Sequence, residues 1–396
     1  MDSGTDAALE CRAGEFSLPD DLHYLNCAYM SPLARAVERA GLEGFRRLRD
    51  PTRIAPSDFF TESDELRRAF AELVRADDPD RVAIVPSVSY GVALAARNLE
   101  VEAGQNLVLA EDQFPSNVYA WSRLAEERGL ELRIVGPGPG DGGSGRGRGE
   151  RWNERLLEAV DGATAAAALP HVHWTDGTRF DLQAVGRRCR EVGAALVVDG
   201  TQSVGALPFD VGRIRPDALI CAGYKWMLGP YSIGTTYLGP RFDDAVPLEE
   251  TWLGRKGSED FGGLVDYEEE YQPGASRHDM GERSNPVTVP MQTAGIRLLL
   301  DWGVERIQEY CRRLTRPLTG EASALGMTVE DEEWRSSHLF GLRLPAEARP
   351  EELAQHLERE DVVVSVRGDA LRVSPHLYND RRDVEALLEV LRQRYG

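Results

Sequence analysis

The stretch ALVVDGTQSVGALPFDVGRIRPDALICAGYKWMLGPYSIGTTYLG at residues 195–239 holds three apolar strand patterns with polar residues between them. Asp199 closes the first pattern, and Lys225 follows the second after a short turn that contains glycine. The carboxyl ends of parallel strands meet at one edge of a sheet, and ligands bind beyond that edge. We therefore expect Asp199 and Lys225 to emerge at the same edge of a sheet.

The alternation of short apolar strands with amphipathic helical stretches runs from about residue 60 to residue 240. This pattern predicts an α/β fold with a mostly parallel central sheet. A helical stretch follows an irregular, acidic segment, and the C-terminal part alternates strand and helix on a smaller scale. The expected strands lie at 81–85, 106–110, 132–135, 165–169, 194–198, 217–221 and 233–238.

With 396 residues, the chain is long enough for two domains. We predict a large domain at 30–285 with the mostly parallel sheet. A small α+β domain would combine 1–29 with 286–396, and a bridging helix at 286–313 would connect the two.

The chain is strongly acidic, with 46 Lys plus Arg against 66 Asp plus Glu and a formal net charge of -20. Such a field repels phosphate backbones and anionic membrane surfaces, so we expect neither nucleic acid nor membrane as a partner. No segment is apolar enough to span a bilayer or to serve as a signal peptide. The five cysteines are scattered and form no CxxC pair, which argues against disulfides and a zinc site. These features predict a soluble cytoplasmic protein without a bound metal.

The Gly-rich segment at 136–150 contains a formal GxGxxG pattern at Gly138, Gly140 and Gly143. Prolines and further glycines surround it, whereas a dinucleotide site needs a tight turn from a strand into a helix. We interpret the segment as a mobile surface loop. An NAD-dependent Rossmann oxidoreductase remains an alternative that the alternating pattern allows, but it lacks a phosphate-binding fingerprint.

Asp199 and Lys225 together indicate a specific chemistry. A carboxylate can keep a pyridine nitrogen protonated, and a lysine can condense with an aldehyde, so the pair suits pyridoxal 5′-phosphate. Taken alone, Asp199 would be interpreted as a helix cap or as the partner of an arginine, and Lys225 as an ordinary surface lysine. Lysine is scarce in this arginine-rich chain, however, and Lys225 stands between aromatic residues that would lower its pKa.

The sequence resembles the class V aminotransferase family, which includes cysteine desulfurases, kynureninases and isopenicillin-N-epimerase-like enzymes. The resemblance covers nearly the whole chain and implies the fold type I architecture of pyridoxal phosphate enzymes. It also implies that Lys225 forms the internal aldimine, that Asp199 pairs with the pyridinium nitrogen and that Gln202 reaches the phenolic oxygen. The pattern D-x-x-Q-S-x-G-x-x-x-x-D followed by G-x-K carries it, at Asp199, Gln202, Ser203, Gly205, Asp210, Gly223 and Lys225.

The resemblance assigns further cofactor contacts on the large domain. Ser87, Val88 and Ser89 would form the phosphate cup at a helix start, although a plain serine N-cap explains Ser87 equally well. Phe114 would stack on the pyridine ring, unless it is a core residue. Thr175 would lie beside the cofactor, and Tyr224 would help to bind the phosphate.

Other residues are assigned to the substrate and to a partner subunit. His173 and Trp174 would line the substrate side. Arg372, which alternates with Leu371 and Val373 on a strand, would hold the substrate's α-carboxylate, the alternative being a solvated or salt-bridged arginine. Trp252 and Asn285 would reach the cofactor phosphate of a second subunit, which implies a homodimer with shared active sites.

We expect an enzyme that acts on an amino acid through an external aldimine. A persulfide-forming desulfurase needs a reactive cysteine on a loop before the C-terminal arginine motif, and the segment VVVSVRGDALRVSPHLYND contains none. Lyase or epimerase-like chemistry is therefore favoured. An aminotransferase and a non-catalytic relative that binds pyridoxal phosphate remain the alternatives.

Overall fold

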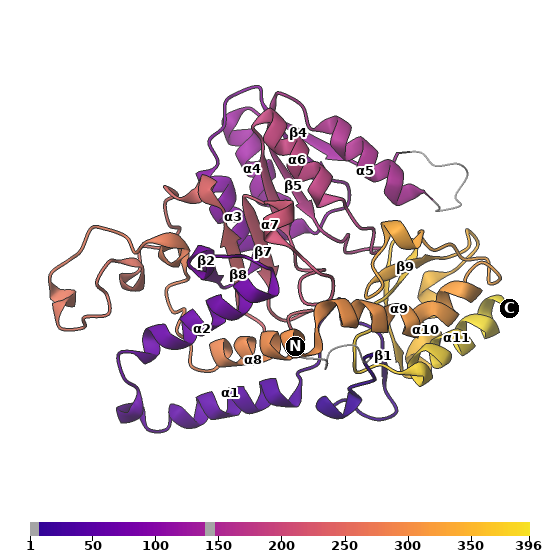
Figure 1. Cartoon of the computed structure of the whole chain (residues 1–396). Helices are drawn as coiled ribbons and strands as arrows, with labels where there is room; N and C mark the ends of the chain where they lie inside the picture. The colour runs from indigo at the N-terminus through magenta and orange to yellow at the C-terminus, as the bar shows by residue number, and fades with distance from the viewer. Residues whose placement is uncertain (1–7, 139–146) are drawn as a thin grey trace, which may run out of the picture.

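The computed structural model describes residues 8–138 and 147–396. A seven-stranded sheet in the order β2-β8-β7-β6-β5-β3-β4 forms its centre (Figure 1). Strand β8 runs antiparallel to both neighbours, and the other adjacent pairs are parallel. The strands are β2 (Val82–Val85), β3 (Asn106–Ala110), β4 (Glu131–Val135), β5 (Thr164–Pro170), β6 (Ala195–Asp199), β7 (Ala218–Ala222) and β8 (Gly234–Leu238).

Every predicted strand of this sheet is present, and each end lies within one residue of its expected position. The inner strands are buried along their whole length, as the uninterrupted apolar runs indicated. The α/β fold with a mostly parallel sheet is confirmed.

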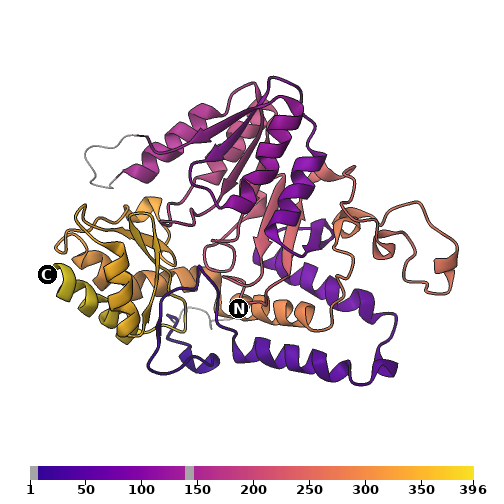
Figure 2. The same cartoon turned by 180° about the vertical axis from the view of Figure 1, so that it is seen from behind.

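Helices cover both faces of the sheet. Helices α3 (Val88–Asn98) and α4 (Tyr119–Arg128) pack through one buried cluster. The opposite face packs against α2 (Asp58–Leu73), α5 (Arg148–Ala159), α6 (Leu182–Val192), the short α7 (Val211–Ile214) and α8 (Thr288–Trp302). Helix α1 (Arg35–Arg47) lies along α8 on its outer side (Figures 1 and 2).

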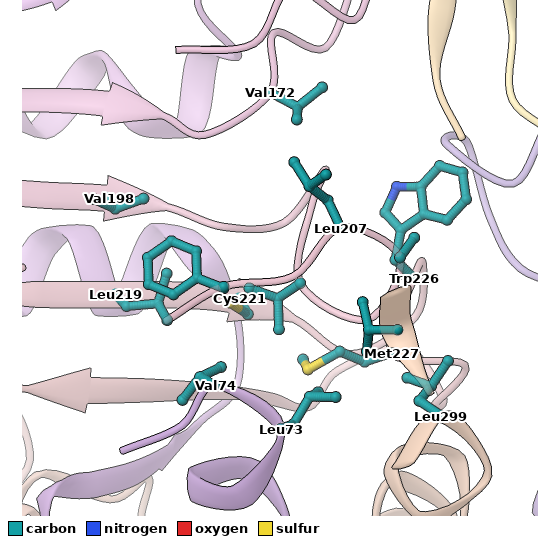
Figure 3. Close-up of a cluster of buried hydrophobic side chains, with 14 of the residues drawn as sticks. Leu73, Val74, Val172, Val198, Leu207, Leu219, Cys221, Trp226, Met227 and Leu299 are labelled. Carbon is teal, nitrogen blue, oxygen red and sulfur yellow. The ribbon is translucent and has the colours of Figure 1, made fainter. Parts of the chain in front are cut away.

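The segment after β7 is anchored in this second core. Trp226 and Met227 are fully buried and lie beside Leu299 of α8 and Leu207 (Figure 3). Burying two large apolar side chains next to Lys225 fixes the backbone of that lysine against the sheet.

A smaller unit follows the sheet in the chain. Strands β11 (Ser365–Arg367), β12 (Ala370–Val373) and β9 (Phe340–Arg343) form an antiparallel sheet, and β1 (His23–Tyr24) pairs with β10 (Val362–Val363). Helices α9 (Val304–Glu321), α10 (Pro350–Arg359) and α11 (Arg381–Tyr395) pack on these strands (Figures 1 and 2). Residues near the N-terminus therefore contribute to the C-terminal unit, although the predicted boundaries at 29/30 and 285/286 stay a prediction.

The single helix expected at 286–313 is wrong. Two helices occupy this region, α8 and α9 (Val304–Glu321). They are separated by Gly303, whose φ of 78° lies in the left-handed region that glycine adopts most easily. The amide of Gly303 donates to Leu299 O and ends α8.

Two segments that the sequence predicted to be irregular, 240–285 and 136–150, differ in the structure. Residues 240–285 form only short 3-10 turns, and part of this segment projects from the body (Figures 1 and 2). In the Gly-rich segment, residues 139–146 lie outside the described residues, and 148–150 belong to α5 instead of a loop. Within the described ranges, no helix has both the length and the apolar content needed to cross a bilayer.

Gly205 is expected to be essential for this packing. Its φ is 102°, and an added Cβ would lie 2.2 Å from Trp226 O. We expect Gly205→Ala to lower the free energy of unfolding by about 2–4 kcal/mol, measured by urea denaturation. Gly104→Ala is the matched control, because its φ is also positive but no atom lies within 4 Å of the added Cβ. Equal losses in the two variants would show that the contact with Trp226 does not matter.

Candidate active site

A cavity of about 220 Å³ lies beyond the carboxyl ends of β2, β3, β5, β6 and β7. Strand β8 runs the opposite way, so its amino end meets the same edge. Most of the predicted site residues line this cavity: Ser87, Val88, Ser89, Phe114, Trp174, Asp199, Gln202, Tyr224 and Lys225.

Lys225 is buried, with 6% of its surface exposed. Burial lowers its pKa to about 8, since the desolvated ammonium is disfavoured more than the nearby Asp199 carboxylate restores it. Its Nζ lies 5.3 Å from the centre of the Phe114 ring and 5.5 Å from the centre of the Tyr224 ring. The uncharged, nucleophilic amine is therefore a minor but much larger fraction near neutral pH than in an ordinary lysine.

Asp199 ends β6 and is almost completely buried. Burial raises the pKa of its carboxyl, and the amide of Thr201, which donates to Oδ1 at 3.0 Å, partly opposes this. Among the described residues, Asp199 forms no ion pair shorter than 4 Å. A buried carboxylate of this kind is suited to a cationic N–H group of a ligand.

Gln202 is held in one orientation. Its Oε1 accepts a hydrogen bond from Trp226 Nε1 at 2.8 Å, and its Nε2 donates to Ala28 O at 3.1 Å. The backbone carbonyl of Gln202 contacts His338 Nε2 at 2.7 Å. Because the amide nitrogen carries two protons, one remains for an acceptor in the cavity.

Ser87 and Ser89 stand at the start of α3. Ser87 is the N-cap, and its Oγ accepts from the amide of Tyr90 at 3.2 Å. The two hydroxyl oxygens lie 2.9 Å apart. A helix start with free amides and hydroxyl groups attracts anions such as phosphate.

Aromatic side chains form another wall. The rings of Phe114 and Trp174 meet edge to face, with centroids 5.4 Å apart. Trp174 Nε1 donates to Asp112 O at 2.7 Å, which fixes the indole. The rings of Tyr224 and Tyr231 lie 4.6 Å apart, and burial raises the pKa of Tyr224.

Arg372 on β12 does not line the cavity itself but contacts its wall. Its Nη1 donates to Trp174 O at 2.9 Å and its Nη2 to Ser365 Oγ at 3.3 Å, while Nε has no partner. Only 2% of the residue is exposed, and burial lowers its pKa to about 10. Both hydrogen bonds go to uncharged oxygens, so within the described parts of the chain the positive charge has no carboxylate partner.

The structure does not bring every predicted residue into the cavity. His173 is buried, and its two ring nitrogens contact Thr175 Oγ1 at 2.7 Å and Glu111 O at 3.0 Å. Neither His173 nor Thr175 is a lining residue. Trp252 packs against aromatic residues of α2, and Asn285 is exposed and accepts from the amides that start α8.

Several lining residues were missed from the sequence. Gln113 and Ser116 follow β3, and Tyr231 and Ser232 precede β8. Gln113 is 6% exposed, and its Oε1 has no hydrogen-bond partner. Their positions close to the ends of predicted strands could have identified them from the sequence.

The comparisons with known proteins agree with this geometry. The sequence model of the family described as aminotransferase class-V matches residues 55–387. The chain belongs to this family. An isopenicillin N epimerase of Streptomyces clavuligerus is 26% identical over 408 residues, which cover 96% of each chain. An uncharacterized aminotransferase of Schizosaccharomyces pombe is 26% identical over 337 residues, covering 84% of this chain and 82% of the relative.

Solved structures show the same fold. The apo structure of a cysteine desulfurase from Thermococcus onnurineus NA1 superposes with a TM-score of 0.82 at 20% identity, covering 98% of this chain and 99% of the other. The fold type I architecture is thereby confirmed. As a member of the class V family, the chain is an enzyme, and its cofactor is pyridoxal 5′-phosphate.

Proposed function

We propose that the cavity holds pyridoxal phosphate through three groups of residues. Lys225 would bind the aldehyde covalently, Asp199 would hold the pyridine nitrogen as a cation, and Ser87 with Ser89 would take the phosphate. Three observations support this fit. The Lys225 amine is buried and its pKa is lowered to about 8, and the buried Asp199 carboxylate has no ion pair among the described residues. The start of α3 also offers the hydroxyl groups of Ser87 and Ser89. When bound, the cofactor stabilises the negative charge that develops at the α-carbon of an amino acid.

The substrate is an α-amino acid whose carboxylate is held by Arg372. The single observation that carries this proposal is the buried guanidinium without a carboxylate partner, next to the cavity wall at Trp174. A buried, uncompensated cation costs free energy in the absence of a ligand, and a carboxylate is the planar anion that fits its fork of donors.

The reaction is proton transfer at the α-carbon with lyase or epimerase-like outcome. Burial lowers the pKa of the Lys225 amine to about 8, close enough to the working pH for the amine to accept and return a proton. The match with an isopenicillin N epimerase over nearly both whole chains supports this outcome. The relative described as an aminotransferase supports the second candidate, in which the amino group is transferred to a keto acid.

An amino-acid panel tests the proposal. The protein loaded with pyridoxal phosphate is incubated with each amino acid, and keto acid, ammonia, sulfide and optical rotation are followed. We expect loss of optical rotation or release of a side-chain fragment. Keto acid formation that depends on an added amino acceptor would instead establish the aminotransferase.

Cysteine variants test the absence of a thiol mechanism. Cys27, Cys189, Cys221 and Cys311 are buried, and no cysteine lines the described cavity. Burial raises the pKa of Cys27 to about 12, which leaves little thiolate. We expect the five single Cys→Ala variants to keep turnover within about threefold. Complete loss of turnover in any folded variant would instead establish a catalytic thiol.

The pH dependence of cofactor capture tests the environment of Lys225. The cofactor-free protein reacts through the uncharged amine, and the pKa of this amine is lowered to about 8. The capture rate should therefore rise with pH through about 8 and level off above it, as followed by absorbance and by borohydride fixation. Lys256 is an internal control, because its pKa is raised by Glu270 and it stays protonated there. A rate that keeps rising to pH 10 would contradict the lowered pKa.

We also propose a homodimer with shared active sites. Trp252 and Asn285 lie outside the cavity of their own chain, and α1 exposes Leu42 and Phe45 on its surface. Burying such apolar side chains against a second copy would stabilise an assembly. Light scattering gives the mass in solution. A monomer that binds the cofactor and turns over at all dilutions would exclude shared sites.

A further inference from the structure

Two arginines of the smaller antiparallel sheet meet at one residue of the cavity wall. Arg372 Nη1 donates to Trp174 O at 2.9 Å, and Arg367 Cζ lies 5.6 Å from the centre of the Trp174 ring. They stand on neighbouring strands, because β11 pairs with β12 so that Ser365 lies opposite Arg372. The two guanidinium groups therefore lie behind the same wall residue of the cavity, although neither arginine is one of the lining residues.

Neither positive charge is compensated within the described parts of the chain. Arg367 Nη1 donates to Val366 O at 2.8 Å, and the hydrogen bonds of Arg372 go to Trp174 O and Ser365 Oγ. The Nε atoms of both arginines are buried and have no partner. The chain has 66 acidic residues, yet none of those that the structure describes forms an ion pair with either arginine. Two like charges placed together repel each other, so an anion bound between them would stabilise the arrangement.

The two charges also act on the catalytic end of the cavity. Both lower the pKa of Lys225, and Arg367 lowers the pKa of Arg372. Like charges that affect each other's ionisation lie within the range of a direct electrostatic interaction. A ligand that reaches Lys225 and Arg372 is therefore close to Arg367 as well.

We propose that Arg367 binds a second carboxylate, carried by the side chain of the substrate, so that the enzyme acts on dicarboxylic amino acids. This inference rests on the proposed function, in which Arg372 takes the α-carboxylate. Among the described residues, Nη2 of Arg367 forms no hydrogen bond and so remains available for a charge-assisted one, and the indole of Trp174 orients the guanidinium. A monocarboxylic substrate would leave this charge uncompensated.

Unreactive carboxylates test the proposal without turnover. The protein loaded with pyridoxal phosphate is titrated by calorimetry with succinate, glutarate and adipate, and with butyrate, pentanoate and hexanoate as the monocarboxylates of equal carbon number. We expect at least one dicarboxylate to bind about tenfold or more tightly than its monocarboxylate. Arg367→Gln should abolish this preference, because it weakens dicarboxylate binding much more than monocarboxylate binding. Arg367→Lys should keep part of it, because the charge remains.

Controls separate the possible failures. Arg382→Gln removes the same charge from an exposed side chain and should keep the preference. Arg372→Gln should weaken both ligand classes. If the wild type shows no preference, or if Arg367→Gln weakens both classes equally, the proposal is overturned and Arg367 only supports the α-carboxylate site or Trp174. Failure to load the cofactor on Lys225, measured first by borohydride fixation, would instead overturn the proposed function.

Discussion

Lys225→Ala is expected to abolish covalent attachment of pyridoxal phosphate and to reduce turnover by at least about 10³-fold. The amine is buried at the cavity edge, its pKa is lowered to about 8, and Trp226 and Met227 fix its backbone in the core. No other lysine can replace it, because the chain contains only Lys256 besides. Borohydride reduction followed by peptide mapping measures the attachment.

Lys256→Ala is the matched control for this experiment. Lys256 is exposed and paired with Glu270 at 2.7 Å on the segment between β8 and α8, so its loss should change neither attachment nor turnover. The Lys225→Ala variant should remain folded, since removing a buried charge relieves a desolvation cost. A folded Lys225→Ala protein that turns over like the parent would show that the cofactor is held elsewhere.

The large sheet could be predicted because its signals are local. Residues 106–110 form an apolar run between polar neighbours, and β3 occupies these same residues. The division of 286–313 into two helices was missed, because the amphipathic pattern continues across Gly303 and only the backbone shows its positive φ. The apolar run at 362–366 is likewise divided, since β10 pairs with β1 from the other end of the chain. Such pairing is not local and leaves no sequence signal.

The site residues that directly follow strands could be predicted from the sequence. Residues whose place in the cavity depends on the direction of the side chain were harder to predict. Asp199 and Lys225 both lie at the expected edge of the sheet and line one cavity. His173 and Trp174 are neighbours at the start of a tight turn, which the hydrogen bond from the amide of Gly177 to His173 O closes at 2.9 Å. Trp174 lines the cavity, whereas His173 turns inward and lies 4.9 Å from the Trp152 ring. A motif gives the position of the turn but not which of the two residues faces the ligand.

Arg372→Lys is expected to retain the cofactor and to weaken amino-acid binding by roughly 1.5–3 kcal/mol, about ten- to a hundredfold. Lysine keeps the positive charge but loses the planar fork that can contact a carboxylate through two donors. The two hydrogen bonds that the Arg372 nitrogens donate to Trp174 O and Ser365 Oγ are also lost or rearranged, so the wall of the cavity loses a support. Titration with an amino acid, followed by the absorbance of the bound cofactor, gives the change in dissociation constant.

The separation of KM from kcat shows whether the effect arises at the carboxylate. Loss of a contact that is equally strong in the bound substrate and in the transition state raises KM and leaves kcat nearly unchanged. General disruption of the cavity would instead lower kcat and cofactor retention together. Arg382→Lys, at an exposed position of α11, controls for the substitution itself. A variant at Arg372 that binds amino acids like the parent would place the α-carboxylate on another residue. The buried guanidinium would then be an internal support of Trp174, and the dicarboxylate inference would lose its first anchor.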